Sequence, residues 1–189
     1  MIIHLTKNEI RQECLAFRKT LPSDAITQSS SKIIEQITKI QVYRSAKHIG
    51  WYLSVQGEVD LAPLCQSALQ EGKSCYVPTI QADKTLRFLP YTAHDKMIPN
   101  RYGILEPDLT PDHAITASSL DLIFLPVVAF DATLTRLGMG GGFYDKTLQD
   151  QRIPCIGVAY EWQKYPALPR DSWDIKPDLI VTERTIYTP

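Results

Sequence analysis

The sequence lacks the features of membrane, secreted and nucleic-acid-binding proteins. No apolar run approaches the ~18–20 residues that a membrane span needs, and residues 1–5 are too few for the apolar core of a signal peptide. The four cysteines form no Cys-x-x-Cys pair, so we expect reduced and mostly buried thiols. A net charge of −1 supports no extended surface for nucleic acid or membrane. We therefore expect a cytoplasmic protein that holds any anionic ligand with a local cluster of cations.

Several catalytic motifs are also absent. The four histidines do not have the spacing of metal ligands, which argues against a zinc site. There is no Gly-x-Ser-x-Gly elbow, and no cysteine lies in a recognisable catalytic setting. Neither a serine nor a cysteine nucleophile is expected.

Glycine is scarce, yet four of the nine glycines lie between positions 138 and 142, in the segment Arg136-Leu137-Gly138-Met139-Gly140-Gly141-Gly142-Phe143-Tyr144-Asp145. Glycine backbones can turn so that successive N–H groups converge on an anion. Residues 143–149 are compatible with a helix, whose N-terminus also favours phosphate. The segment predicts a phosphate cradle; the alternative is a flexible linker or a tight turn.

This loop fits neither standard nucleotide fingerprint. A P-loop ends in Gly-Lys-Ser/Thr, whereas Gly142 is followed by Phe143. The dinucleotide motif needs a third glycine at position 143 and a strand immediately before the loop. The nearest expected strand, 122–125, lies well upstream, so a nucleotide site here would belong to another family.

The hydrophobic pattern predicts alternating helices and strands. Helices are expected near 7–20, 24–38 and 61–71, the second capped by Ser23, and strands near 48–53, 74–78, 85–90, 122–125, 153–159 and 179–181. Residues 91–112 are expected to form a long loop. This order predicts a single α/β domain over residues 1–189, a three-layer sandwich around a largely parallel sheet, with a possible antiparallel edge from region 74–90.

The first helix is expected to place a basic stripe beside its apolar face. Thr6 and Glu9 form a capping box. At 100° per residue, Ile10, Cys14, Phe17 and Leu21 form the core-facing arc, and the adjoining arc holds Lys7, Arg11 and Arg18. These cations are predicted to lie at the rim of a pocket, where they would bind phosphate. The alternative is a solvated helix face.

The segments described so far resemble the 5-formyltetrahydrofolate cyclo-ligase family, also called methenyltetrahydrofolate synthetases. The resemblance covers 7–183 and is most specific at Phe130-Asp131 and Arg136–Asp145, where the family usually reads Phe-Asp and then Arg-Leu-Gly-x-Gly-x-Gly-Tyr-Tyr-Asp. Two positions depart from the pattern. Leu134 stands where the family generally has glycine, and Val127 stands where a glycine commonly follows the proline.

The resemblance implies an ATP-dependent ligase. Such an enzyme converts 5-formyltetrahydrofolate and ATP into 5,10-methenyltetrahydrofolate, ADP and phosphate. It implies catalytic roles for Arg136, Lys7 and Arg11. It also implies ATP binding by these three residues and by the loop residues Leu137, Gly138, Met139, Gly140, Gly141, Gly142, Phe143 and Tyr144.

The resemblance further implies a folate site and a magnesium site. Leu53 and Glu58, which follow an expected strand, match family positions at the folate, and an exposed loop carboxylate is the alternative for Glu58. Tyr102 would stack on the pterin or serve only in packing. Asp145 and Asp174 would hold Mg2+ with the nucleotide phosphates, although Asp174 also suits a turn.

Two other interpretations stay open at this point. One is a different enzyme on a related α/β scaffold, such as a sugar-phosphate isomerase or a CoA transferase, because scaffold does not fix chemistry. The other is a binding module that retains a nucleotide cradle without turnover. Under every interpretation we expect small-molecule ligands, no nucleic acid or membrane partner, and a monomer.

Overall fold

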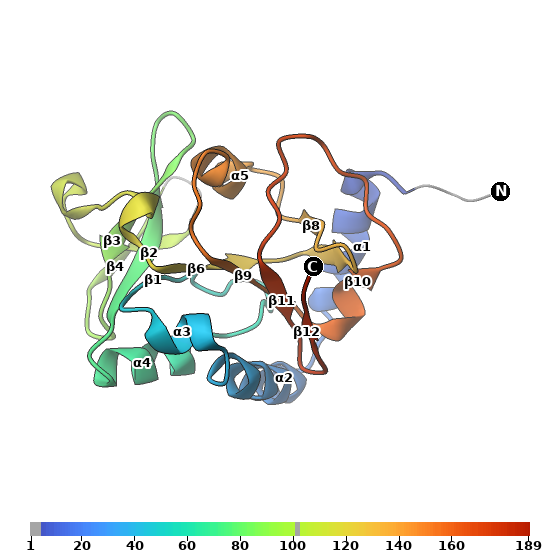
Figure 1. Ribbon diagram of the computed structural model, residues 1–189, viewed down its shortest axis with the longest axis horizontal. Coiled ribbons are helices and arrows are strands. Elements are labelled where there is room, and N and C mark those ends of the chain that lie inside the picture. Colours follow the sequence, from blue (N-terminus) through green and yellow to red (C-terminus); the bar gives the residue numbers. More distant parts are fainter. Residues whose placement is uncertain (1–4, 101–102) are drawn as a thin grey trace.

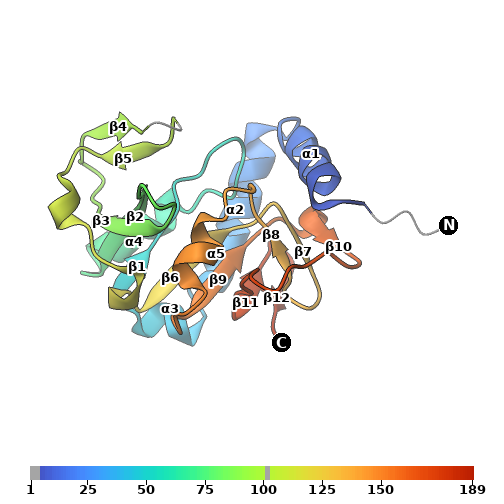
Figure 2. The same ribbon diagram turned by 90° about the horizontal axis from the view of Figure 1, so that it is seen from above.

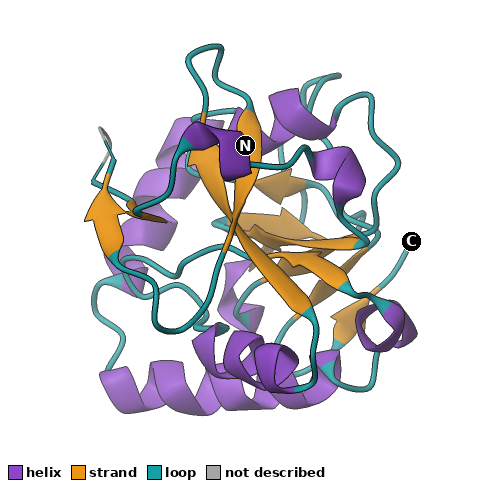
Figure 3. Cartoon of the chain, turned by 90° about the vertical axis from the view of Figure 1, so that its left-hand side faces the viewer, coloured by secondary structure: helices purple, strands orange, loops and turns teal. Residues whose placement is uncertain are grey.

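A seven-stranded sheet forms the centre of the computed structural model, which describes residues 5–100 and 103–189 (Figure 3). The strand order is β12-β11-β9-β6-β1-β2-β3. The strands are β1 (His48–Gly50), β2 (Ser74–Ile80), β3 (Leu86–Pro90), β6 (Leu122–Pro126), β9 (Cys155–Val158), β11 (Leu179–Val181) and β12 (Ile186–Tyr187). Only the edge strands β3 and β12 run antiparallel to their neighbours among these described strands. The largely parallel sheet and its antiparallel edge are confirmed.

Helices cover both faces of this sheet, which makes the predicted three layers (Figure 1). One face carries α2 (Ser23–Ile37), α3 (Gln41–Ser45) and α4 (Ala62–Gln70). The other carries α5 (Phe143–Leu148) and the 3-10 turn η2 (Ala117–Ser119). The first four residues of β6 are completely buried, which is what a continuous apolar run between two helical layers requires.

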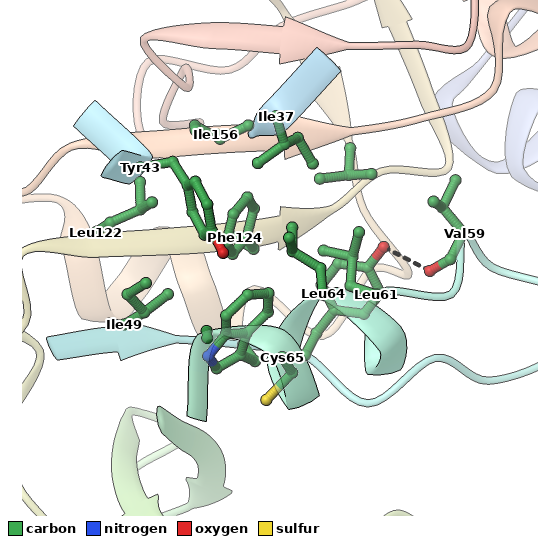
Figure 4. Close-up of a cluster of buried hydrophobic side chains, with 14 of the residues drawn as sticks. Ile37, Tyr43, Ile49, Val59, Leu61, Leu64, Cys65, Leu122, Phe124 and Ile156 are labelled. Carbon is green, nitrogen blue, oxygen red and sulfur yellow. Dashed lines mark hydrogen bonds between the residues drawn. The ribbon is translucent and has the colours of Figure 1, made fainter. Parts of the chain in front are cut away.

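The larger core lies between the sheet and the α2–α4 layer (Figure 4). Trp51 stacks on Phe124 of β6 at 4.7 Å between ring centroids, and Tyr43 of α3 lies at 6.3 Å from the same ring. Leu64 and Ile156 fill the space beside these rings. Aromatic burial of this kind dominates core energetics, so this side of the sheet is a rigid support.

A second, smaller sheet carries the N-terminal helix. It consists of β7 (Ala129–Asp131) between β8 (Arg136–Leu137) and β10 (Lys164–Tyr165). Helix α1 (Lys7–Arg18) packs against it, and both lie on the side of the molecule away from β2 and β3 (Figure 2). The contact joins Ile10 and Cys14 to Val128, Ala129 and Leu137. The predicted capping box between Thr6 and Glu9 is present at the start of α1.

Three local predictions were wrong. Ser23 is the first residue of α2 and makes no capping hydrogen bond, because Pro22 occupies the N-cap position. The strand expected over 48–53 ends at Gly50, where the chain turns toward the cavity described below. Region 91–112 is not a plain loop, since β4 (Met97–Pro99) and β5 (Leu105–Pro107) pair as an antiparallel hairpin, followed by η1 (Pro111–His113).

Leu134, at the position where a glycine was expected, closes the turn between β7 and β8. Its φ is +63°, its side chain is 2% exposed, and its N–H donates to the Asp131 carbonyl at 3.0 Å. A left-handed leucine costs about 1–2 kcal/mol, and a buried leucine contributes about 1.5–3 kcal/mol. The leucine therefore keeps the glycine-type geometry by compensating for backbone strain with burial against Phe130 and Ile180.

We expect Leu134→Gly to lower the free energy of unfolding by about 1–2 kcal/mol, because lost burial exceeds relieved strain. Leu134→Ala should be less stable than Leu134→Gly, because alanine loses the burial and keeps the strain. Urea denaturation of the two variants measures this order. A glycine variant less stable than the alanine variant would show that the positive φ is not strained.

Candidate functional site

A cavity of about 540 Å³ opens at the carboxyl ends of β1, β2 and β6. Parallel α/β sheets bind ligands at this end, because the chain leaves each strand there through loops that carry polar side chains. Segments from across the sequence line it: the start of α1, the turn after β1, the glycine loop 138–142 and the loop before β11. The cavity therefore lies between the main sheet and α1.

The sequence-predicted site residues come together in this one cavity. Its wall includes Lys7, Arg11, Leu53, Glu58, Arg136, Leu137, Gly138, Met139, Gly140, Gly141, Gly142, Phe143, Tyr144, Asp145 and Asp174. Tyr102 is outside the described residues. The structure thus gathers the remaining candidates at one place, although it does not test what each of them binds.

The glycine loop has the backbone geometry of an anion cradle. Gly140 has φ +96° and Gly142 has φ +69°, conformations that side-chain-bearing residues avoid. Within the described part of the chain, the N–H groups of residues 139–142 donate to no other residue. The loop follows directly after β8, so the sequence-based view that no strand precedes it was wrong. Four exposed N–H donors remain available to a ligand.

Lys7 lies between two carboxylates. Its Nζ donates to Asp171 Oδ2 at 2.8 Å and also pairs with Asp174 Oδ2. Burial alone would lower the pKa of Lys7, but the hydrogen bonds and charges of Asp171 and Asp174 outweigh it and raise that pKa. Burial alone would raise the pKa of Asp174. The hydrogen bonds from Lys7 and from the Asp171 N–H outweigh burial and lower that pKa below its usual value. Lys7 is therefore cationic near pH 7.

Arg11 contacts the glycine loop directly. Its Nε donates to the Gly138 carbonyl at 2.8 Å, which pulls one end of the guanidinium onto the loop. A Cβ placed at Gly140 would lie 3.4 Å from Cζ of Arg11, which is van der Waals contact, so the guanidinium rests against the loop at this residue as well. Arg11 therefore lies at the rim of the cavity, beside the glycine loop, as the helical pattern predicted.

Arg136 is buried beneath the loop and held from one side. Its Nη2 donates to Asp145 Oδ1 at 2.8 Å, and the same oxygen accepts the Ile175 N–H at 3.1 Å. This pairing brings Asp145 beside the segment that carries Asp174. The Nε of Arg136 is buried and has no hydrogen-bond partner among the described residues. A buried donor without a partner is costly, and the guanidinium as a whole lines the cavity.

Glu58 is not an exposed loop carboxylate, because it is 6% exposed. Its Oε1 lies 3.5 Å from Nη2 of Arg18, and its Oε2 accepts the Val55 N–H at 3.1 Å. Burial raises the pKa of Glu58, and the charge of Arg18 partly opposes that shift. Both residues are therefore buried. Glu58 is part of the cavity wall and not an exposed loop carboxylate, and Arg18 is its buried partner and not part of a solvated helix face.

The helical pattern misplaced two residues of α1. Arg18 was expected at the pocket rim but is 2% exposed, and Phe17 was expected in the core but is 50% exposed. The reason is that α1 packs on a narrow second sheet, so its apolar arc needs only Ile10 and Cys14. Phe17 instead packs edge-on against Trp162, at 4.7 Å between centroids.

Sequence reasoning missed Asp171 and Trp173, which also line the cavity. Asn100 and Glu106 line it as well, and they belong to the segment around Tyr102 that the family resemblance placed at the substrate. Glu106 accepts hydrogen bonds from Thr79 Oγ1 at 3.0 Å and from Asn100 Nδ2 at 2.7 Å. The only signal for Asp171 was its spacing of three residues from Asp174, and the hairpin that carries Glu106 was read as a loop.

A sequence profile of the 5-formyltetrahydrofolate cyclo-ligase family matches residues 4–183. The chain belongs to this family. A 5-formyltetrahydrofolate cyclo-ligase from Haemophilus influenzae is 37% identical over 88% of each chain, and one from Escherichia coli K12 is 36% identical over 75% of this chain and 81% of the relative. Membership of the family makes the protein an enzyme of the ligase class.

Solved structures agree with the family assignment. The structure of Aquifex aeolicus 5,10-methenyltetrahydrofolate synthetase matches with a TM-score of 0.85 and 31% identity, covering 97% of this chain and 93% of that one. The resemblance to cyclo-ligases is therefore confirmed in both sequence and fold. It argues against the isomerase, transferase and non-catalytic alternatives.

Proposed function

We propose that this enzyme cyclises 5-formyltetrahydrofolate to 5,10-methenyltetrahydrofolate at the expense of ATP, releasing ADP and phosphate. Its family and relatives support the substrate and the product. The observation that carries the proposal is the shared cavity, whose wall combines Lys7, Arg11 and Arg136 beside the glycine cradle with an apolar part that also holds the carboxylates of Glu58 and Glu106.

The cationic end would bind the nucleotide. Lys7 would exchange one aspartate for a distal phosphate, and Arg11 would present its two Nη groups beside the cradle, one of which makes only a long hydrogen bond of 3.5 Å to Asn8 Oδ1. The N–H groups of residues 139–142 would donate to phosphate oxygens, which they are free to do. Arg136 would face the transferred phosphoryl group, since it lines the cavity beneath the glycine loop.

The apolar end would bind the folate. Leu53, Val55 and the carboxylate of Glu58 line the cavity after β1. A carboxylate in this position would accept hydrogen bonds from the N–H groups of the folate ring system. Tyr102 stays a proposed stacking partner for the pterin.

The reaction would need no protein nucleophile. The formyl group on nitrogen 5 is an amide, so its oxygen leaves poorly as it stands. Attack of that oxygen on the γ-phosphorus breaks the bond to ADP and forms an iminium phosphate. The lone pair of nitrogen 10 then attacks the formyl carbon, the C–O bond breaks with loss of phosphate, and phosphate takes the proton from nitrogen 10. The protein would contribute positioning and charge neutralisation at the phosphates.

The residues present fit a magnesium ion that enters with the nucleotide. Asp145 Oδ2 and Asp174 Oδ1 accept no hydrogen bond from the described residues, so each carboxylate keeps one free oxygen. No cluster of three ionisable ligand residues occurs within 5–100 and 103–189, so phosphate oxygens and water would complete the shell. When bound, magnesium neutralises charge on the phosphates.

The decisive experiment mixes purified protein with 5-formyltetrahydrofolate and Mg-ATP and follows the methenyl product by its near-ultraviolet absorbance. We expect product in proportion to enzyme, with one ADP released per product. Omission of ATP, or addition of EDTA, should stop turnover. Product formation without ATP would contradict the proposed mechanism, and ATP hydrolysis without product would contradict the proposed reaction.

Two expectations about the protein as a whole also stay proposals, a monomer and a cytoplasmic location. Within the described ranges, no helix has both the length and the hydropathy of a membrane span. Size-exclusion chromatography with light scattering measures the assembly state.

A further inference from the structure

Arg18, near the end of α1, is a buried cation that touches both sides of the cavity. Its Nη2 lies 3.5 Å from Glu58 Oε1 and 3.9 Å from the Met139 sulfur, and its Nε donates to the Gln56 carbonyl at 2.9 Å. Only 2% of the residue is exposed. Burying a guanidinium costs free energy, and a single ion pair of this length compensates poorly for it. Packing alone would be served as well by methionine or leucine.

The contacts of Arg18 belong to two segments that face different ligands in the proposed reaction. Met139 is part of the glycine loop, and Gln56 and Glu58 form the turn after β1. Gln56 has φ +51° and Gly57 has φ +75°, so this turn is tight. A Cβ at Gly57 would lie 3.2 Å from Cγ of Arg18, which means that the arginine side chain lies directly against the turn.

We propose that Arg18 is a positioning residue that couples the two substrate sites, holding the Glu58 carboxylate toward the folate and linking its turn to the glycine loop through Met139. The inference rests on the proposed function and deepens it. Occupation of the glycine loop by a triphosphate fixes Met139, Arg18 and then Glu58. The second ligand therefore binds to a site that is already ordered, and this gives positive cooperativity between the nucleotide and the folate.

Arg18 also sets the charge of Glu58. The other titratable groups that interact with this carboxylate are the phenols of Tyr52, Tyr144 and Tyr160. Burial raises the pKa of Tyr160 to about 12 and moves the pKa of Tyr52 and Tyr144 further upward, so all three stay neutral near pH 7. Arg18 is thus the cation that favours ionised Glu58 among the described residues. Without it, the raised pKa of Glu58 moves still higher.

The test compares Arg18→Met, Arg18→Lys and wild type by calorimetric titration. Each protein is titrated with 5-formyltetrahydrofolate and with the imido analogue of Mg-ATP, first singly and then with the other ligand at saturation. In wild type we expect each ligand to lower the Kd of the other by the same factor, about 10-fold. In Arg18→Met that factor should fall to about 1, and the Kd of the folate alone should rise about 10-fold.

Arg18→Lys separates the two roles of the side chain. Lysine keeps the charge, so the acid limb of the kcat/KM profile for the folate should stay near its wild-type pH. It cannot reach Gln56, Glu58 and Met139 together, so the coupling factor should still fall. In Arg18→Met the acid limb should move to higher pH, because Glu58 then ionises later. A purely structural arginine would change stability and leave both the limb and the coupling factor in place.

Arg44→Met is the matched control, because Arg44 is an exposed arginine on α3, and it should behave as wild type. Far-ultraviolet circular dichroism and thermal midpoints establish folding. The proposal is overturned by a wild type without coupling, or by a folded Arg18→Lys or Arg18→Met that keeps the full coupling factor. If the wild-type protein shows the coupling between the two ligands but forms no product, the role of Arg18 stands and the proposed reaction is wrong.

Discussion

Arg136→Met is expected to lower kcat by about 10³-fold or more, because removing a cation that faces a transferring phosphoryl group typically costs that much. Methionine keeps much of the volume of arginine and removes the donor to Asp145 together with the unpartnered buried Nε. Initial rates at saturating ATP and folate measure the loss. The KM for ATP should change far less than kcat, since the interaction is made mainly in the transition state.

Arg87→Met, at an exposed position on β3, is the matched control and should retain wild-type rates. Asp145→Ala should also be inactive, because it releases Arg136 and removes a proposed magnesium ligand. Circular dichroism must show that both site variants are folded. If both keep activity within tenfold of wild type, the assignment of this end of the cavity is wrong.

Gly140→Ala is expected to lower kcat/KM for ATP by about 100-fold. Its φ of +96° is strained for alanine, whereas the added Cβ would make only an ordinary van der Waals contact with the Arg11 guanidinium at 3.4 Å. The substitution therefore acts by disturbing the backbone conformation that presents the N–H donors. The strain itself should lower the free energy of unfolding by about 1–2 kcal/mol.

Gly72→Ala provides the control for that strain. Gly72 has φ +80°, ends α4, and a Cβ there would meet no atom within 4 Å. It should lose a similar amount of stability in urea denaturation and keep the wild-type kcat/KM for ATP. Equal loss of activity in the two variants would mean that Gly140→Ala acts through stability and not through the cradle.

The sequence was most informative where a short pattern dictates local geometry. The Thr6–Glu9 capping box, the apolar run of β6 and the cluster of glycines each predicted their element, because the cause lies within a few residues. The family resemblance then joined these pieces into one site. The cavity brings together the candidates that lie in the described ranges.

The sequence was least informative where the answer depends on what a segment packs against. A helical wheel assigns Phe17 to the core and Arg18 to the rim, but α1 rests on a small second sheet and buries a narrower arc. The Arg18–Glu58 pair joins positions 40 residues apart, and no local pattern encodes such a contact. Asp171 likewise reaches Lys7 only through the tertiary fold.

The small sheet under α1 has a mechanical consequence. Helix α1, β7, β8 and the glycine loop are joined by the packing of Ile10 on Leu137 and by the Arg11 hydrogen bond to Gly138, whereas Leu53 extends from the main sheet. The residues proposed to bind the triphosphate are therefore fixed relative to one another by one helix and one small sheet. Arg18 and the packing of Phe130 on Ile180 join this unit to the seven-stranded sheet, so a substitution in the small sheet would be felt at both proposed ligand sites.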